Sequence, residues 1–393
     1  MREVVITGMA RTPIGTFGGS LKPLLANELG VIAVKEAIKR SGLEDLSLID
    51  DVLMGNCMMR TDEINVARCI ALKSGIPFST PAATIQRQCA SGMQAAVFGA
   101  QKIMLEEDEI VLAGGVESMS NIPYLLKDMR WGNRQFDVKA VDSLFEGLTD
   151  PLGGFMMGIT AENLAEKYDI SREEQDELAY ISQTRALKAI DSGWFKEEIV
   201  PVEIPQRKGA PLVFDTDEHP RRGTTIESLA KLRAAFKKDG TVTAGNASGI
   251  NDGAAAMLLM SADKAKQLGI KPIAKLVAHS LAAVEPELMG YGPVPAVKKL
   301  LEKTGMTIDD IDLIELNEAF AAQYLACEKL LGLDREKTNI CGSGIALGHP
   351  VGATGARIMI SLIHQLKRLG KKRGIATLCV GGGMGKATMI EML

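Results

Sequence analysis

Residues 88–96 read Gln-Cys-Ala-Ser-Gly-Met-Gln-Ala-Ala and place Cys89 where an extended segment, beginning at Pro81, turns into a helical pattern. The first amides of a helix have no partner inside it and the dipole there is positive, so both effects favour a thiolate. Lowering the pKa of a cysteine from about 8.5 to about 7 takes roughly 2 kcal/mol, which a helix terminus and one partner can supply. This stretch alone leaves two interpretations open: a nucleophile, or a small buried side chain.

A histidine and a second cysteine occupy similar positions later in the chain. His349 lies in the Gly-rich stretch 342–355, before an Ala/Ile-rich helical pattern, and Cys379 ends an apolar strand that faces the glycine run 381–383. A histidine can take a proton from a thiol, and glycine amides can stabilise an oxyanion. The run lacks the Gly-Lys-Ser/Thr ending of a phosphate loop. Together these residues favour a nucleophilic site over packing.

A faint repeat relates the two ends of the chain. Residues 33–42 and 49–55 predict a helix ended by Gly and then an apolar strand, and residues 296–305 and 311–317 repeat the pattern. At a similar offset the corresponding pairs are Cys89 and His349, Gly92 and Gly352, and Ala96 and Ala356. Packed about a pseudo-two-fold axis, the two junctions could meet at the centre of the molecule.

Bulk properties exclude several classes of protein. A chain of 393 residues predicts two or three packed units, and a formal charge of -4 argues against nucleic acid as the main partner. The six cysteines show no CxxC spacing, which predicts reduced thiols. A strand is predicted almost from Met1, leaving no room for a transit peptide, and the apolar runs are too short to span a membrane. We expect a cytoplasmic protein without a metal site.

The strand-helix alternation predicts mixed sheets covered by helices, and it is lost from about 121 to 245. One clear helix is expected there, with Ser171 as N-cap and Glu174 closing a capping box. Residues 206–238 hold eight Lys/Arg against four Asp/Glu. This basic stretch is either a solvated face or a site for an anionic ligand.

The chain resembles the thiolase family, of the acetyl-CoA acetyltransferase type, over essentially its whole length. Eight ordered segments carry the resemblance: 10–15, 88–96, 114–120, 157–163, 242–249, 317–320, 348–350 and 379–383. The resemblance implies an α/β thiolase fold in which two pseudo-symmetric halves stack as α-β-α-β-α layers. The halves would be residues 1–270, with an inserted loop domain at about 121–245 over the site, and residues 271–393.

The resemblance also implies a reaction: reversible condensation of two acetyl-CoA to acetoacetyl-CoA and CoA, by a ping-pong mechanism through an acyl-Cys89 intermediate. His349 would be the base that activates Cys89 and part of an oxyanion hole, and Cys379 the acid/base. A water held by Asn317 would complete that hole, and the amides of Cys89 and Gly381 would form a second one. From the residues alone, Asn317 could equally cap a loop.

Seven further residues match substrate contacts of the family: Ser248, Arg221, Ser228, Met157, Ala247, Phe236 and Phe320. Arg222 leaves the register of Arg221 open. The basic stretch would attract CoA phosphates. Coenzyme A is then a substrate and product, with no permanently bound cofactor and no membrane partner, and a homotetramer (dimer of dimers) or homodimer is expected.

Two positions depart from the family pattern. Met156 stands where short-chain members commonly carry His, and an apolar, adaptable thioether predicts a broader substrate range. Cys341 stands where many members have Asn, eight residues before His349, and is expected near the site without an assigned role. The remaining cysteines Cys57, Cys69 and Cys327 are interpreted as packing, and His219, His279 and His364 as non-catalytic.

Three alternatives stay open on the sequence. The first is a 3-ketoacyl-CoA thiolase of broader chain length. The second is a ketoacyl synthase-like condensing enzyme, although Asn317 and Cys379 occupy the thiolase places where such enzymes usually have histidines. The third is a dinucleotide-binding protein, suggested by the strand-turn at residues 4–8 but lacking GxGxxG.

Overall fold

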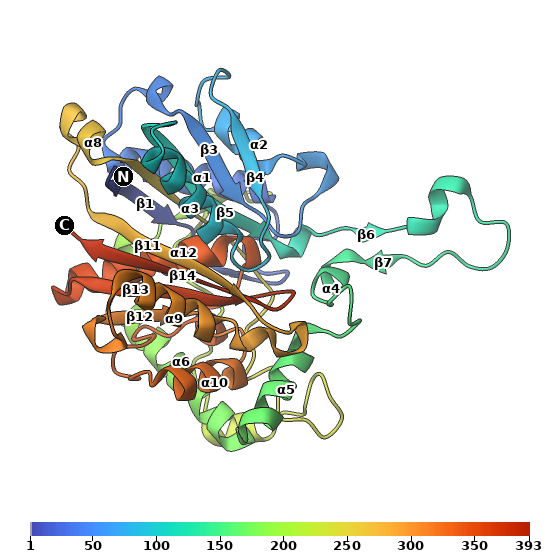
Figure 1. Ribbon diagram of the computed structural model, residues 1–393. Coiled ribbons are helices and arrows are strands. Elements are labelled where there is room, and N and C mark those ends of the chain that lie inside the picture. Colours follow the sequence, from blue (N-terminus) through green and yellow to red (C-terminus); the bar gives the residue numbers. More distant parts are fainter. Residues whose placement is uncertain (1) are drawn as a thin grey trace.

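The computed structural model describes residues 2–393 and shows two halves stacked on each other, with one thin arm projecting from the body (Figure 1). Strands of the N-terminal half follow the order β4-β3-β5-β10-β1, and those of the C-terminal half the order β12-β13-β14-β11. Their bounds are β1 (Val4–Arg11), β3 (Asp51–Gly55), β4 (Ala82–Ile85), β5 (Ile110–Ser118), β10 (Asn251–Ser261), β11 (Ala274–Ala283), β12 (Leu313–Leu316), β13 (Arg373–Val380) and β14 (Met384–Met392). The short β2 (Gly15–Thr16) pairs with β10.

The two sheets are continuous with each other, which the sequence pattern did not indicate. Strand β1 pairs antiparallel with β11 at Val5 opposite Lys275 and Ile6 opposite Ala274. These two residue pairs join nine of the strands into one path, and β2 extends the sheet to ten strands within residues 2–393. The domain division predicted after residue 270 falls between the helix that follows β10 and strand β11.

Helices cover both outer faces and fill the middle, so the predicted α-β-α-β-α layering is confirmed. The first outer layer is α1 (Ala26–Ser41), α2 (Val66–Lys73) and α8 (Ala262–Leu268), the central layer is α3 (Ser91–Met104) and α12 (Val351–Leu369), and the second outer layer includes α9 (Pro293–Thr304) and α10 (Ala321–Leu331). Three separate apolar cores lie between these layers. Both predicted helices of the repeat end as expected, because Gly42 and Gly305 take left-handed C-cap conformations.

Small residues let α3 and α12 approach closely at the centre of the molecule. A side chain at Gly92 would lie 2.9 Å from the Gly352 carbonyl oxygen and 3.1 Å from Ala356, and one at Gly355 would lie 2.6 Å from the Met93 nitrogen. The positions paired by the sequence repeat therefore face one another across this contact. As predicted, the two strand-helix junctions meet.

Residues 119–250 form the insertion, because β5 and β10 on either side of it are antiparallel neighbours in the sheet. It contains β6 (Tyr124–Leu125), β7 (Val141–Asp142), α4 (Ser143–Gly147), α5 (Met157–Tyr168), α6 (Arg172–Asp191), β8 (Val202–Ile204), β9 (Leu212–Phe214) and α7 (Ile226–Ala230). The capping box of Ser171 and Glu174 is present at the start of α6, whereas α5 was not predicted. Leu164 and Leu178 from α5 and α6 pack with Tyr324 of α10, so the insertion covers the C-terminal half.

The short 3-10 helices are η1 (Leu46–Leu48), η2 (Thr61–Glu63), η3 (Met119–Asn121), η4 (Lys127–Trp131), η5 (Trp194–Glu197), η6 (Pro286–Tyr291) and η7 (Ile308–Asp310), and α11 (Gly344–Leu347) is a single turn. No helix within residues 2–393 has the length and apolar character needed to cross a membrane.

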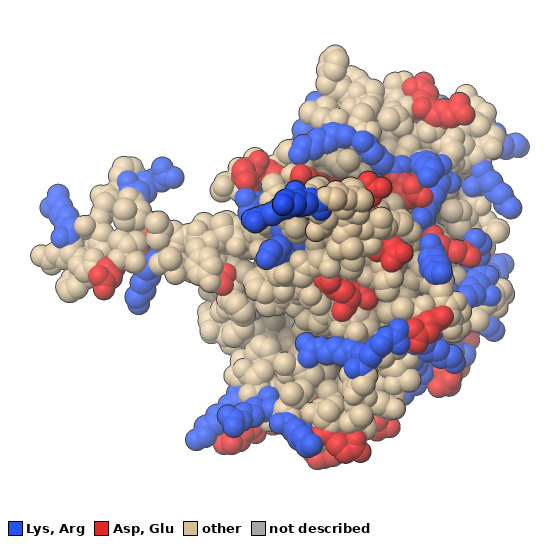
Figure 2. Space-filling view, turned by 180° about the vertical axis from the view of Figure 1, so that it is seen from behind, with Lys and Arg blue, Asp and Glu red and all other residues tan. Residues whose placement is uncertain are grey.

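The projecting arm is built from β6, η4 and β7 and carries exposed apolar side chains. Trp131 and Phe136 are each 93% exposed, and Leu126 and Met129 are about half exposed. Figure 2 shows the arm standing clear of the body, with Lys and Arg side chains interspersed along it.

Candidate active site

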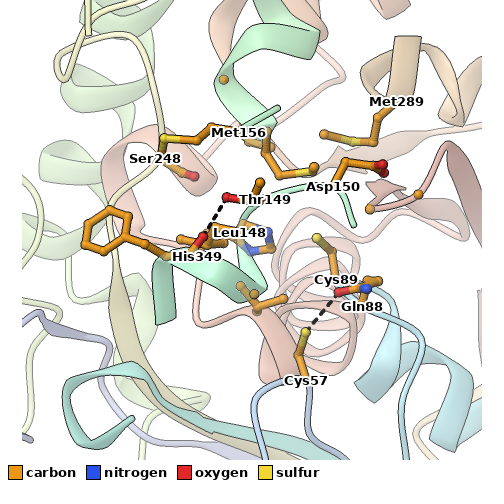
Figure 3. Close-up of a pocket in the computed structure, with 18 of the residues that line it drawn as sticks. Cys57, Gln88, Cys89, Leu148, Thr149, Asp150, Met156, Ser248, Met289 and His349 are labelled. Atoms are coloured by element: carbon orange, nitrogen blue, oxygen red, sulfur yellow. Dashed lines mark hydrogen bonds between the residues drawn. The ribbon is translucent and has the colours of Figure 1, made fainter. Parts of the chain in front are cut away.

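One cavity of about 330 Å³ lies where the two halves and the insertion meet. Both junctions contribute to it: Cys89 precedes α3 and His349 precedes α12 (Figure 3). The turn between β13 and β14 adds Gly381 and Gly382, and the insertion adds residues between 145 and 158. Residues more than 250 positions apart thus face one cavity.

Cys89 follows a strained residue and faces two backbone amides. Gln88 has a left-handed φ of +45°, which is uncommon for a residue with a side chain, and the Ser91 hydroxyl donates to its carbonyl oxygen at 2.6 Å. Burial raises the pKa of the Cys89 thiol to about 11, although hydrogen bonds from the amides of Gly381 and Cys89 to the sulfur lower it. Desolvation thus outweighs the amides, so the position before a helix does not by itself lower the pKa of this thiol.

His349 is buried and its ring is held from one side. Nδ1 lies 2.6 Å from the Thr354 hydroxyl oxygen, and that hydroxyl donates to the Pro350 carbonyl at 2.9 Å. Because a hydroxyl has one proton to donate, the oxygen accepts from Nδ1–H, which leaves Nε2 with its lone pair. Burial and then the positive charge of Arg357 lower the pKa of His349 to about 3. The imidazole is therefore neutral at pH 7.

Cys379 and Asn317 lie behind the cavity wall, since both are fully buried and neither is among the described residues that line the cavity. Burial, followed by the charge on Cys89, raises the pKa of the Cys379 thiol well above its usual range. The backbone N–H of Asn317 donates to the Thr377 carbonyl at 3.0 Å, which ties the end of β12 to β13. The structure thus brings the predicted site residues together, with these two in a deeper layer.

Most of the predicted substrate contacts lie at the cavity. Ser248, Met157, Phe236 and Phe320 line it, whereas Ala247 sits one step away in a β-bridge with Phe320. The rings of Phe236 and Phe320 meet edge to face, with centroids 5.9 Å apart. This aromatic pair gives the wall beside Ser248 a fixed shape.

Arg221 and Ser228 line a second hollow of about 280 Å³. The neighbouring Arg222 is paired with Asp191 at 2.5 Å, whereas within residues 2–393 the Arg221 side chain has no ion pair. Arg221 is thus the better candidate of the two for an anionic ligand. The Ser228 hydroxyl donates to the Thr225 carbonyl at 2.7 Å, and its oxygen accepts from the Thr225 backbone N–H at 3.0 Å, which closes the capping box of α7.

The sequence interpretation missed one residue that lines the cavity, Cys57, and a buried carboxylate beside it, Glu117. Cys57, assigned to packing, lines the cavity and donates from its sulfur to the Gln88 side-chain oxygen at 3.2 Å. The buried Glu117 accepts from the backbone N–H groups of Gly352 at 2.8 Å, Cys57 at 3.1 Å and Met58 at 3.2 Å. Burial raises the pKa of this carboxyl to about 7. Its position at the end of β5, beside the end of β3, was the available signal.

Six methionines also line the cavity: Met58, Met119, Met156, Met157, Met289 and Met384. Only Met156 and Met157 were singled out from the sequence. By contrast, Cys341 packs in a small core with Ile14 and Ala186 and accepts from Arg368, so the expectation that it lies near the site is wrong. His219, His279 and His364 do not line the cavity, in agreement with their non-catalytic interpretation.

Comparisons with known proteins cover the whole chain. Two family models match, described as Thiolase, N-terminal domain (residues 4–263) and Thiolase, C-terminal domain (residues 270–392). An acetyl-CoA acetyltransferase of Syntrophomonas wolfei is 51% identical over 397 residues, covering 100% of both chains. The crystal structure of the Bacillus anthracis acetyl-CoA acetyltransferase superposes with a TM-score of 0.98 at 55% identity, covering 100% of this chain and 99% of that one.

A structure of human mitochondrial 3-ketoacyl-CoA thiolase in complex with CoA is also similar, with a TM-score of 0.96 at 45% identity. It covers 100% of this chain and 98% of that one. The similarity therefore extends to proteins named for two different substrate ranges.

Proposed function

The chain belongs to the thiolase family, and we propose that it is an acetyl-CoA C-acetyltransferase that joins two acetyl-CoA into acetoacetyl-CoA and CoA, or runs the reaction in reverse. The observation that carries the proposal is the Cys89 sulfur beside the amides of Cys89 and Gly381, in one cavity with His349. Nucleophile, base and donors for an oxyanion are then all present. Membership of this family sets aside the ketoacyl synthase and dinucleotide-binding alternatives.

In the first half-reaction, the Cys89 sulfur attacks the acetyl-CoA carbonyl carbon while its proton moves to Nε2 of His349. Both groups are neutral beforehand, because the pKa of the thiol is about 11 and that of the imidazole about 3. Forming a thiolate-imidazolium pair in advance is therefore costly, and proton transfer accompanies attack. The amides of Cys89 and Gly381 stabilise the resulting oxyanion, and the thioester bond of acetyl-CoA breaks. CoA leaves with the proton of Cys379, so Cys379 becomes a thiolate while His349 keeps the Cys89 proton on Nε2.

In the second half-reaction, Cys379 removes an α-proton from a second acetyl-CoA. The enolate oxygen is stabilised by Nε2–H of His349 and by a water held by Asn317. The enolate carbon then attacks the acetyl carbonyl on Cys89 and a carbon-carbon bond forms. The bond to the Cys89 sulfur breaks, and the sulfur takes back the proton from Nε2 of His349. In the cleavage direction Cys379 protonates the enolate and deprotonates CoA.

The methionine-lined cavity wall supports a second, broader range of acyl-CoA substrates. The cavity wall includes Met156 and Met289 among its six methionines, and flexible thioethers adapt to acyl groups of different shape. A 3-ketoacyl-CoA thiolase of broader chain length is therefore the alternative function. The chemistry at Cys89 is the same in both.

CoA is proposed as substrate and product, with Ser248 at the pantetheine arm and Arg221 toward the phosphates. We further propose a homotetramer or homodimer. Its support is the apolar arm with Trp131 and Phe136, together with β4, which is an edge strand in the described sheet. A cytoplasmic location stays a prediction from the cysteine pattern.

Acetylation of Cys89 tests the proposal. Incubation with acetyl-CoA should add an acetyl mass to the peptide that contains Cys89, and Cys89→Ser should abolish both this label and the condensation, a loss of about 10⁴-fold or more. Cys341→Ser, in a separate core, is the matched control and should acetylate normally. Acetyl found on Cys379 or Cys57 would contradict the assignment.

A further inference from the structure

Arg357 is a buried cation behind the candidate site. It lies on α12, two turns after His349, and is 1% exposed. Its Nη2 donates to the Asn317 side-chain oxygen at 3.5 Å, and its Nη1 is 3.9 Å from Glu315 Oε2, beyond hydrogen-bond distance. Its Nε and Nη1 have no hydrogen-bond partner among the residues that the structure describes.

The nearby carboxylates are engaged elsewhere or protonated. Arg11 pairs with Asp217 and with Glu198, each at 2.7 Å. Glu315 accepts from the Gln365 amide at 2.8 Å, and burial raises its pKa to about 8, so it is mostly protonated at pH 7. The Arg357 charge is therefore not neutralised by a directly bonded carboxylate within residues 2–393.

A guanidinium has donors only, and this fixes the orientation of the Asn317 amide. The atom of Asn317 that faces Arg357 must be the oxygen, because the NH2 group cannot accept a hydrogen bond. The NH2 group then points away from Arg357. Its Nδ2 is buried and lacks a partner in the described part of the chain, so it is a donor available to another group.

We propose that Arg357 is a positioning residue that presents the Asn317 NH2 group as the donor that acts, through water, on the enolate oxygen. The inference rests on the proposed function and adds Arg357 and the direction of the hydrogen bond. With its side-chain oxygen facing Arg357, Asn317 can act on the water only by donating a hydrogen bond from its NH2 group. The inference also confines the effect of Arg357 on Asn317 to the enolate step, since the acyl-transfer oxyanion is held by backbone amides.

The test measures two half-reactions separately in the full-length protein. Exchange of the α-protons of acetyl-CoA with D2O reports enolate formation, and the rate at which acetyl-CoA adds an acetyl mass to Cys89 reports acyl transfer. The wild-type protein is measured first, and the absence of both reactions would contradict the proposed function. In an active wild type, the inference about Arg357 is tested by comparing each variant's two rates with the wild-type rates.

Arg357→Lys keeps the positive charge near His349 but loses the planar guanidinium with its fixed N–H donors. It should lower proton exchange about tenfold or more while leaving Cys89 acetylation within about threefold, because one lost oxyanion donor costs about 10²–10³ at most. Arg368→Lys, farther along the same helix and stacked on Trp194, is the control and should change neither rate. Equal loss of both half-reactions in Arg357→Lys would overturn the inference.

Two further variants keep the inference testable if Arg357→Lys folds poorly. Asn317→Asp can still accept from Arg357 but has no NH2 group, so proton exchange should fall about 10²-fold with acetylation retained. Exchange within about threefold of wild type would show that Asn317 acts as an acceptor, contrary to the inference. In the Asn317→Ala background, Arg357→Lys should cause no further loss of exchange, and additive losses would mean that Arg357 acts independently.

Discussion

The junctions at Cys89 and at His349 are built alike but differ in what surrounds the reactive side chain. Each stands just before a helix of the central layer, and each helix has a glycine three residues later, Gly92 and Gly352, at the contact between them. At Cys89 the surrounding donors are backbone amides, which favour negative charge on sulfur. At His349, burial and then the positive charge of Arg357 disfavour a positive imidazole.

Under the proposed function, one repeated unit supplies two kinds of chemistry, a nucleophile at Cys89 and a base at His349. Backbone geometry places both groups at the same cavity, and it would do so for any small side chains. The acid-base behaviour comes instead from burial and from residues that differ between the two junctions: Gly381 at one, and Thr354 and Arg357 at the other. Both groups are neutral at rest, which is why the proposed mechanism couples proton transfer to attack and does not begin from a preformed ion pair.

Removing the imidazole of His349 should have the largest effect on the difference between the two junctions. His349→Ala should lower the rate of Cys89 acetylation by about 10²–10⁴-fold, because a positioned general base contributes on that order. Thr354→Val, which removes the oxygen that accepts from Nδ1, should give a smaller loss. An acetylation rate in His349→Ala within threefold of wild type would show that Cys89 is activated by another group.

The same base predicts a flat pH profile in wild type. With a pKa of about 3, His349 stays in its basic form as the pH falls from 7 to 5. The kcat/KM for acetylation should therefore hold over this range, whereas a base of ordinary pKa 6.5 would lose about 30-fold at pH 5. A loss of that size would mean that Arg357 and burial do not act on His349 as inferred.

Adding a methyl group at Gly92 or at Gly352 should have a smaller effect, which differs between the two junctions in the free energy of unfolding. A Cβ at Gly352 would meet the Val116 carbonyl oxygen at 2.5 Å and backbone atoms of Asn56 and Cys57 at 2.9 Å. At Gly92 the closest contact is 2.9 Å. Gly352→Ala should therefore lower the free energy of unfolding by about 1–3 kcal/mol and more than Gly92→Ala does, as measured by urea denaturation. The reverse order would contradict the packing described here.

Much of the fold could be predicted because local signals and periodicity agree. The helix ends at Gly42 and Gly305 and the capping box at Ser171 depend on residues within one turn, so they are visible in sequence. The pairing of β1 with β11 could not be predicted, because it joins Ile6 to Ala274 through tertiary contact alone. Helix α5 was missed because its burial comes from α10, far along the chain.

In the site, residue types were predictable and their environments were not. Helix-terminus reasoning pointed to Cys89, which the structure places at the cavity, but the size of its desolvation depends on the insertion and on the turn at Gly381. The sequence around Cys57 favours packing, because nothing local distinguishes this residue from a buried cysteine. Its contact with Gln88 exists only because β3 lies beside β4 in the sheet.

Replacing Met156 should produce the smallest effect, a change of preference and not of chemistry. Met156 lines the cavity at the start of α5, and Met156→His would place a polar ring in an apolar wall. A methylene in such a pocket is worth about 1–3 kcal/mol, so a graded response is expected. Thiolysis of acetoacetyl-CoA should change little, while thiolysis of 2-methyl or longer 3-oxoacyl-CoAs should fall about tenfold.

Met156→Leu, which keeps the wall apolar, should preserve the wild-type ratio of these rates. If wild type already rejects every substrate beyond four carbons by several orders of magnitude, Met156 does not broaden the range. The two junctions would then serve acetoacetyl-CoA alone, with selection made elsewhere in the methionine-lined wall.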